Sequence, residues 1–181
     1  MATPLRGAWT GNRGCLHRGE EIVRFHAGNL WIVCALEFRG RHSELFRPGR
    51  FTWLFFHDEA VAFAAGHRPC GECRHASYVA YRDALGGLRA PELNTLLHAE
   101  RIERGTHRRR LHRTPWRELP DGAFVLDGTP KLVLGDALVE WTTAGYGARA
   151  ARPTQGDAKA ITPPSTLEVL RAGYSLQIAT A

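Results

Sequence analysis

The chain has 181 residues, 44% of them hydrophobic, and its 24 basic and 18 acidic side chains give a formal net charge of +6. This composition argues against wholesale disorder, and no apolar run approaches the roughly 20 residues that a membrane-spanning helix needs. We therefore expect a globular cytoplasmic protein without a membrane partner, large enough for one core or for one core with a smaller appended one.

Almost all of the basic residues are arginine, since only Lys131 and Lys159 are lysine. The planar guanidinium group suits phosphates and base edges, which favours nucleic acid as a partner. A GC-rich genome would produce the same preference for arginine over lysine. Composition alone leaves these two explanations open.

The first predicted elements are strands. Residues 30–38 are rich in β-branched and aromatic side chains, and the turn at Ala27-Gly28-Asn29 connects them to residues 22–25 as a hairpin. Residues 51–56 predict a further strand after the breaker Arg47-Pro48-Gly49-Arg50. Cys34 is therefore expected on a sheet.

Three helices should follow these strands. Residues 58–65 are rich in alanine, with acidic side chains at the start, where the helix dipole favours them, and Gly66 as the C-cap. A second helix is expected from about residue 77 to 85. A third begins near Pro91 and ends before Gly105.

The last part of the chain has a β-rich pattern. Residues 122–126, 131–134 and 137–141 predict a three-stranded meander with glycine-containing turns. A short helix should begin at the capping box Ser165–Glu168, and a terminal strand is expected near residues 174–178.

The run Arg68-Pro69-Cys70-Gly71-Glu72-Cys73 carries the strongest chemical signal. Two cysteines three positions apart in a tight turn present two thiolates to one Zn²⁺ ion. A thioredoxin-like redox pair would follow a strand, whereas here a predicted helix precedes the pair. Zinc is therefore the expected cofactor, with Cys70 and Cys73 as ligands.

The remaining zinc ligands are less constrained by the pattern. The chain has two more cysteines, Cys15 and Cys34, and together the four would fill a tetrahedral site. His17 is an alternative to Cys15, and the choice between them stays open. Cys34 could instead be a small buried apolar side chain of its strand.

Residues 58–73, in which an alanine-rich helix runs into Gly66-His67-Arg68-Pro69-Cys70-Gly71-Glu72-Cys73, resemble the second half of the zinc-binding methyl-phosphotriester domain of the bacterial Ada DNA-repair proteins. The resemblance implies zinc binding, DNA as the partner, and methyl transfer from a DNA phosphotriester to a zinc-bound cysteine. By that analogy Cys15 or Cys34 would be the nucleophile. The Cys-x-x-x-Cys pair of the family is missing, and Glu72 stands where the family tends to have a basic residue.

A zinc-dependent enzyme is the alternative interpretation. His57-Asp58-Glu59 and the later cysteines spell the signature of nucleobase deaminases, with Glu59 as the proton shuttle. The nine residues between Glu59 and Pro69 are too few for the deaminase fold. In a hydrolase or nuclease, Glu59, Glu72 or Asp58 would transfer protons. The catalytic candidates are Glu59 and Glu72 for this enzyme and Cys15 as the nucleophile that the Ada resemblance implies.

The predicted fold class is α+β, with a zinc-stapled N-terminal hairpin and helix region, residues 1–112, packed as one compact unit with a β-rich part, residues 113–181. The predicted function is nucleic-acid binding, plausible in DNA repair or damage handling. The arginines expected to contact phosphates are Arg13, Arg68, Arg74, Arg108, Arg109 and Arg110.

Overall fold

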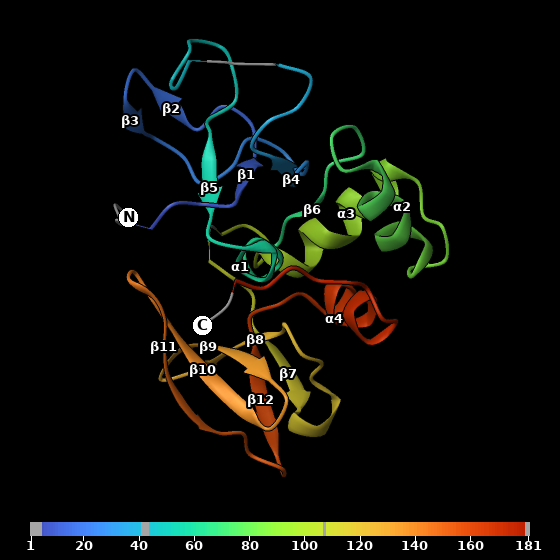
Figure 1. The fold of residues 1–181 in the computed structure, drawn as a ribbon. Coiled ribbons are helices and arrows are strands. Elements are labelled where there is room, and N and C mark those ends of the chain that lie inside the picture. The colour runs from blue at the N-terminus through green and yellow to red at the C-terminus, as the bar shows by residue number, and fades with distance from the viewer. Residues whose placement is uncertain (1–4, 41–43, 107, 180–181) are drawn as a thin grey trace.

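The computed structural model describes residues 5–40, 44–106 and 108–179 of the chain. Figure 1 shows an upper sheet built from the N-terminal part, a lower sheet built from the C-terminal part, and helix α1 (Glu59–Ala64) between them. Helices α2 (His75–Asp83), α3 (Ala90–Arg101) and α4 (Pro164–Arg171) lie to one side. The α+β class expected from the sequence is confirmed.

The upper sheet has four strands in the order β5-β1-β4-β6. Strand β1 (Trp9–Asn12) pairs antiparallel with β4 (Ile32–Ala35) and with β5 (Leu54–Phe56), and the short β6 (Arg68–Pro69) joins β4 in parallel. Because β6 directly precedes the paired cysteines, its parallel pairing places them beside β4.

The expected hairpin between residues 22–25 and 30–38 is wrong. Strand β4 pairs with β1 instead, and β3 (Glu21–Ile22) pairs with β2 (His17–Arg18). Ile22 and Phe25 remain largely exposed, whereas Val33 of β4 is fully buried. The local pattern predicted residues 22–25 as the partner of β4, but pairing with the distant β1 buries Val33 in the shared core.

Helices α1, α2 and α3 lie close to their predicted residues, whereas α4 begins at Pro164 with Pro163 as its N-cap and without a side-chain capping bond, so the capping box expected at Ser165–Glu168 is wrong. Asp58 caps α1 by accepting a hydrogen bond from the Val61 amide at 2.8 Å, and Gly66 follows the helix with φ +82°. Helix α3 has Pro91 in its first turn, as the pattern predicted. Helix α2 begins directly after the cysteine turn, two residues earlier than expected.

The lower sheet is antiparallel, with strand order β11-β10-β9-β8-β12-β7. The predicted meander is confirmed in its three central strands, which pair in sequence order. A 3₁₀ turn, η1 (Trp116–Glu118), follows β7. The strands are β7 (His112–Pro115), β8 (Phe124–Asp127), β9 (Thr129–Leu134), β10 (Ala137–Thr142), β11 (Gly145–Ala151) and β12 (Asp157–Ala160).

The expected terminal strand near residues 174–178 is wrong, because this segment is irregular. Its backbone bonds to the start of α1 instead of to a sheet. The Gln177 amide donates to Glu59 Oε2 at 3.1 Å, and the Ala179 amide donates to Asp58 Oδ2 at 3.0 Å. The C-terminal segment thereby fastens α1 in place.

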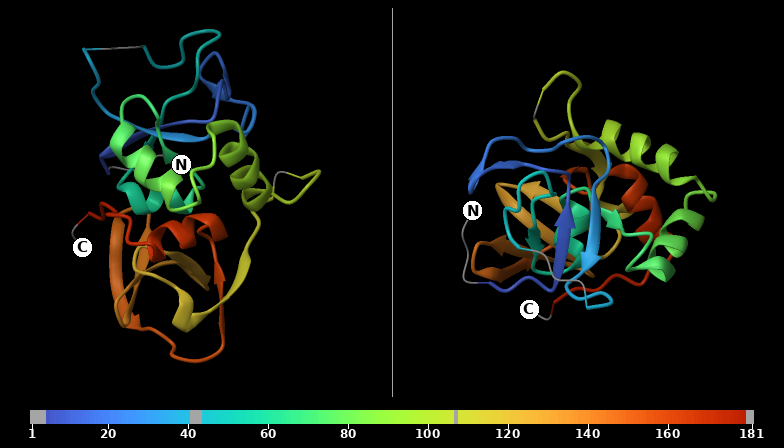
Figure 2. Two further views of the ribbon diagram at one scale, coloured as in Figure 1. Left: turned by 90° about the vertical axis from the view of Figure 1, so that its right-hand side faces the viewer. Right: turned by 90° about the horizontal axis from the view of Figure 1, so that it is seen from above.

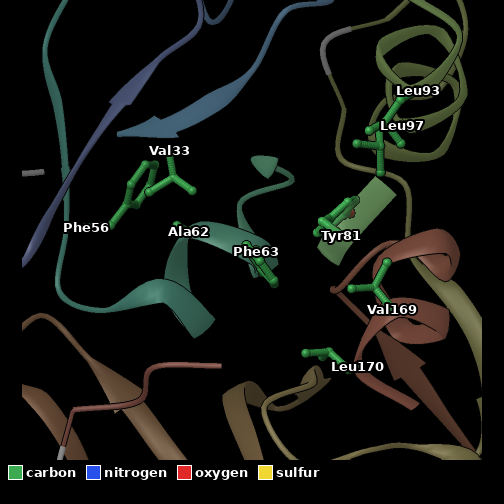
Figure 3. Close-up of a cluster of buried hydrophobic side chains, with 9 residues drawn as sticks. All are labelled: Val33, Phe56, Ala62, Phe63, Tyr81, Leu93, Leu97, Val169 and Leu170. Carbon is green, nitrogen blue, oxygen red and sulfur yellow. The ribbon is translucent and has the colours of Figure 1, made fainter. Parts of the chain in front are cut away.

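Two apolar clusters meet at α1. Figure 3 shows the first, in which Phe63 of α1 packs among side chains of α2, α3, α4 and the upper sheet, including Tyr81 and Leu170. In the second, Ala60 and Ala64 pack against the lower sheet. Figure 2 shows α4 beside α3, so the C-terminal part returns to the N-terminal core.

The division of the chain into a region of residues 1–112 and a region of residues 113–181 stays a prediction.

Among the helices of the described residues, none combines the length and the apolar character required to cross a membrane.

Candidate metal centre

Three cysteines come together where the upper sheet meets the turn before α2. Cys34 lies on β4, and the Cys70 amide donates to the Val33 carbonyl at 2.9 Å, which continues the parallel pairing of β6. Cys73 follows in the same turn. The Sγ atoms of Cys34, Cys70 and Cys73 all lie within 4.8 Å of one another.

This spacing suits one metal ion. A zinc ion lies about 2.3 Å from each sulfur, so two sulfurs of a tetrahedral site are roughly 3.8 Å apart. The three sulfurs, all within 4.8 Å of one another, would move together by up to about 1 Å to reach that geometry. Thiolates are soft donors, and a site made of three of them binds Zn²⁺ in preference to Mg²⁺ or Ca²⁺. The residues present therefore fit zinc.

The turn between the two close cysteines is ordered by backbone groups. The Arg74 amide donates to the Cys70 carbonyl at 3.2 Å, and the Glu72 amide points at Cys70 Sγ at 3.4 Å. An amide directed at sulfur stabilises its thiolate form. Helix α2 starts at His75 and so holds the far end of the turn.

The three thiols share their protons unequally. A hydrogen bond from Cys34, followed by backbone amides of Cys73 and Glu72, lowers the pKa of Cys70 to about 5 against the opposing effect of burial. The hydrogen bond to Cys70 and burial raise the pKa of Cys34, and burial raises that of Cys73. A divalent cation would remove this competition, because it stabilises all three thiolates at once.

A cavity of about 630 Å³ adjoins the cysteines. All three of them line it, together with Glu72 and side chains of β1 and of the segment before β5. An ion held by the three sulfurs would therefore lie at the wall of an open space. The arginine and aromatic lining residues are Phe38, Arg47, Arg50, Phe51 and Trp53.

Cys15 and His17 do not join the three-cysteine group among the residues that the structure describes. Cys15 Sγ donates to the His17 carbonyl at 3.6 Å. His17 is buried, and its Nδ1 lies 2.6 Å from the Thr52 hydroxyl. Of the four predicted ligand positions, the structure thus brings together Cys34, Cys70 and Cys73.

The acidic candidates have different surroundings. Glu59 is buried, accepts a hydrogen bond from the Tyr174 hydroxyl at 2.8 Å and forms an ion pair with Arg74 at 2.5 Å. Asp58 accepts the Tyr146 hydroxyl at 2.7 Å. Both carboxylates therefore serve the junction of α1 with the C-terminal segment.

Glu72 lines the same cavity as the three cysteines, whereas Glu59 and Asp58 are not among its lining residues. His57 packs instead against the rings of Trp141 and Tyr146, and it is not part of the described metal-ligand group. The deaminase arrangement of a histidine and two cysteines on one ion is thus not formed by His57.

Several of the predicted phosphate-contacting arginines have partners inside the protein. Arg68 is buried and donates to Asn94 Oδ1 at 2.9 Å. Arg74 pairs with Glu59 and lies 4.0 Å from the Trp9 ring centre. Arg108 is exposed. Arg13, Arg109 and Arg110 are partly buried.

The pattern-based prediction did not include the arginine and aromatic side chains of residues 47–53 in a site. Arg47-Pro48-Gly49-Arg50 was interpreted only as a strand breaker, and Phe51 and Trp53 only as strand residues. A signal was present, because two arginines beside two aromatic residues form a pattern typical of single-stranded nucleic-acid binding.

Comparisons of the chain with protein-family models, with curated proteins and with solved structures find no match.

Proposed function

We propose that Cys34, Cys70 and Cys73 bind one Zn²⁺ ion whose remaining coordination position faces the adjoining cavity. The observation that carries this proposal is the approach of three Sγ atoms to within 4.8 Å at the wall of a 630 Å³ cavity. Three protein ligands with an open fourth position are typical of a reactive zinc site, whereas a purely structural site has four protein ligands.

The ligand of this cavity is proposed to be nucleic acid, with DNA as the first choice. Arg47 and Arg50 are exposed and line the cavity, where they can bind phosphates. The rings of Phe51 and Trp53 lie 5.2 Å apart and offer faces on which bases stack. The net charge of +6 favours approach to a polyanion.

The resemblance of residues 58–73 to the Ada zinc domain supports a role in DNA repair. The corresponding reaction would be alkyl transfer to a cysteine. The thiolate sulfur of Cys34 would attack the methyl carbon of a phosphotriester, and the phosphodiester would leave with the electron pair of the broken carbon–oxygen bond. Bound zinc would supply the thiolate character of the sulfur.

A zinc-dependent hydrolase acting on nucleic acid is the second candidate. The presence of Glu72 on the cavity wall favours it, because a carboxylate there could accept a proton from water. The two candidates differ in stoichiometry: a hydrolase turns over, whereas a methyl-accepting cysteine is consumed after one reaction.

Binding of a fluorescent single-stranded DNA, measured by anisotropy over a series of salt concentrations, tests the nucleic-acid role. We expect Arg50→Ala to weaken binding and to reduce the salt dependence, and Trp53→Ala to cost about 1–3 kcal/mol through lost stacking. Arg117→Ala is the matched control, since that side chain is 82% exposed and does not line the cavity. Equal binding by all three variants would refute the role.

Incubation with DNA carrying methyl phosphotriesters separates the two candidate reactions. Alkyl transfer predicts one added methyl group on the peptide that contains Cys34, found by mass spectrometry, and no reaction by Cys34→Ser. Hydrolysis predicts repeated cleavage with no mass change in the protein. Absence of both outcomes would reject both reactions.

A further inference from the structure

A cluster of basic side chains lies between the two sheets, away from the cysteines. It contains Arg13 after β1, His67 before β6, Arg101 at the end of α3, and Arg109 before β7. His67 and Arg101 have no exposed surface. Arg13 and Arg109 are partly buried.

Direct contacts connect the members of this basic cluster. Arg13 Nε lies 3.2 Å from His67 Nε2, which accepts its hydrogen bond. The guanidinium carbons of Arg13 and Arg101 lie 4.3 and 4.7 Å from the centre of the same Trp31 ring. Arg109 donates to the carbonyls of Ala64 and Ile161. The cluster is therefore fixed by the fold.

Among the residues that the structure describes, the basic cluster has no acidic counterpart. In the described part of the chain, none of the ion pairs involves Arg13, Arg101 or Arg109. Arg101 Nη1 donates to the Asn29 carbonyl at 3.1 Å, whereas among the described side chains Arg101 Nε and Nη2 and Arg109 Nε are buried without a hydrogen-bond partner. A buried charge without a partner is strongly destabilising, so natural proteins rarely retain one unless something else neutralises it.

The shifts in pKa agree with this picture of uncompensated charge. Burial lowers the pKa of Arg13 and of Arg109 to about 10, and for Arg13 repulsion from Arg109 adds to the effect. Burial, together with repulsion from Arg109, Arg13 and Arg68, lowers the pKa of Arg101 to about 9. All three remain charged near neutral pH.

Gly66 shows that the position of Arg101 is specifically accommodated. A Cβ atom at Gly66 would lie 2.8 Å from Cγ of Arg101, too close for normal packing. The glycine that ends α1 therefore also leaves room for the stem of the arginine. The fold keeps this guanidinium group inside rather than letting it reach solvent.

A cavity of about 300 Å³ opens at this cluster, between α1 and the lower sheet. Arg13 and Arg109 are its charged lining residues, and Arg101 lies within electrostatic range of both. None of the lining residues belongs to the metal cavity. The apolar lining residues are Val61, Ala64, Ala65, Phe124, Pro130, Trp141 and Ile161.

We propose that this second cavity is a phosphate-binding site in which Arg13 and Arg109 contact the oxyanion and Arg101 contributes a third positive charge. Three guanidinium groups favour an anion of high charge density, and a phosphate monoester carries close to two negative charges near neutral pH. The ligand supplies the missing counter-charge.

Two sources of the phosphate group are possible: the free inorganic ion and a nucleoside monophosphate. The apolar walls with Trp141 and Phe124 would add stacking and burial for a nucleobase, whereas free phosphate would leave them empty. Calorimetric titration of the zinc-loaded protein with inorganic phosphate and with AMP separates the two, with sodium chloride at matched ionic strength as the blank.

We expect saturable binding of both phosphate compounds, at least tenfold tighter for AMP if the nucleotide is the source and equal if free phosphate is. Arg109→Met should weaken binding at least tenfold, and Arg117→Met should leave it unchanged. Arg109→Lys, which keeps the charge but not the fork, should give intermediate affinity. Each variant is first checked for zinc content and a cooperative thermal transition.

A second readout covers a variant that folds poorly. Phosphate should raise the melting temperature of the wild-type protein more than chloride does, and this excess should disappear in Arg101→Met. No heat of binding above the chloride blank, or wild-type affinity in Arg109→Met, would overturn the site. Because zinc content and DNA anisotropy are measured separately, a failure here leaves the proposed function standing, and the reverse also holds.

Discussion

Cys34 on β4 and Cys70 after β6 approach each other because the two strands are parallel neighbours, with the Cys70 amide bonded to the carbonyl next to Cys34 at 2.9 Å. Their sulfur atoms lie within 4.8 Å of each other, although Cys34 is on strand β4 and Cys70 is in the turn before α2. A metal ion at this point would join the upper sheet to the helical part of the molecule.

Removal of the metal should therefore loosen the N-terminal half. Treatment with a strong chelator at neutral pH leaves three close thiols that compete for protons, so we expect a lower melting temperature, restored by added Zn²⁺. Differential scanning calorimetry measures the change. In Cys73→Ser the chelator should have little further effect on the melting temperature. A decrease as large as in the wild type would show that the chelator acts elsewhere.

Glu59 should be a stability residue. The Glu59→Gln change removes the charge that pairs with Arg74 at 2.5 Å and weakens the bond from the Tyr174 hydroxyl. Because the buried Arg74 cation then loses its partner, we expect the free energy of unfolding, measured in urea, to fall by about 3–5 kcal/mol. Zinc content should stay at the wild-type level, whereas an undiminished stability would contradict the role. Glu72→Gln is the comparison, with little change in stability expected.

His67 should make the protein sensitive to mild acid. Burial, followed by repulsion from Arg13, Arg101 and Arg109, keeps its pKa well below the ordinary value. Below about pH 6.5 the imidazole of His67 is protonated in the unfolded chain but stays neutral in the folded protein. The free energy of unfolding therefore falls by up to about 1.4 kcal/mol for each unit by which the pH is lowered.

Urea unfolding of wild type and His67→Gln between pH 7 and pH 5 measures this dependence. The glutamine keeps an acceptor for Arg13 but does not titrate, so its curve should be flatter. Parallel curves for the two proteins would show that other groups cause the acid sensitivity.

Phe63 should be central to the shared core. It is fully buried and contacts the rings of Tyr81 and Tyr174. Phe63→Ala should lower the free energy of unfolding by about 3–5 kcal/mol. Phe55→Ala is the control, since that side chain is 55% exposed and should cost much less. Similar losses in both variants would contradict the placement of the core.

Local signals predicted the local elements well. The acidic start of α1, Gly66 at its end, and the turns of the β8–β10 meander are decided by neighbouring residues, and all of them are present. The pairing of β4 with β1 was missed because it depends on burial in a core formed by distant segments. The irregular C-terminal segment was missed because its partners are the acids of α1 rather than a strand.

The candidate metal site shows the same limit. The spacing of Cys70 and Cys73 identified one half of it, whereas the position of Cys34 depends on the parallel β4–β6 pairing, which no local pattern predicts. For the arginines, the sequence shows that the side chains are charged but not whether they face the solvent or the protein interior. Arg68 and Arg74 turn inward to Asn94 and Glu59, so phosphate contact by these two stays an untested prediction.

The zinc content of purified protein tests the central claim most directly. Metal analysis of the wild type should find about one zinc ion per chain, and Cys34→Ser should lose most of it, because two thiolates alone bind zinc weakly. Cys15→Ser is the matched control and should keep its zinc, since Cys15 is outside the described three-cysteine group. Full zinc retention in Cys34→Ser, or absence of zinc from the wild type, would contradict the account.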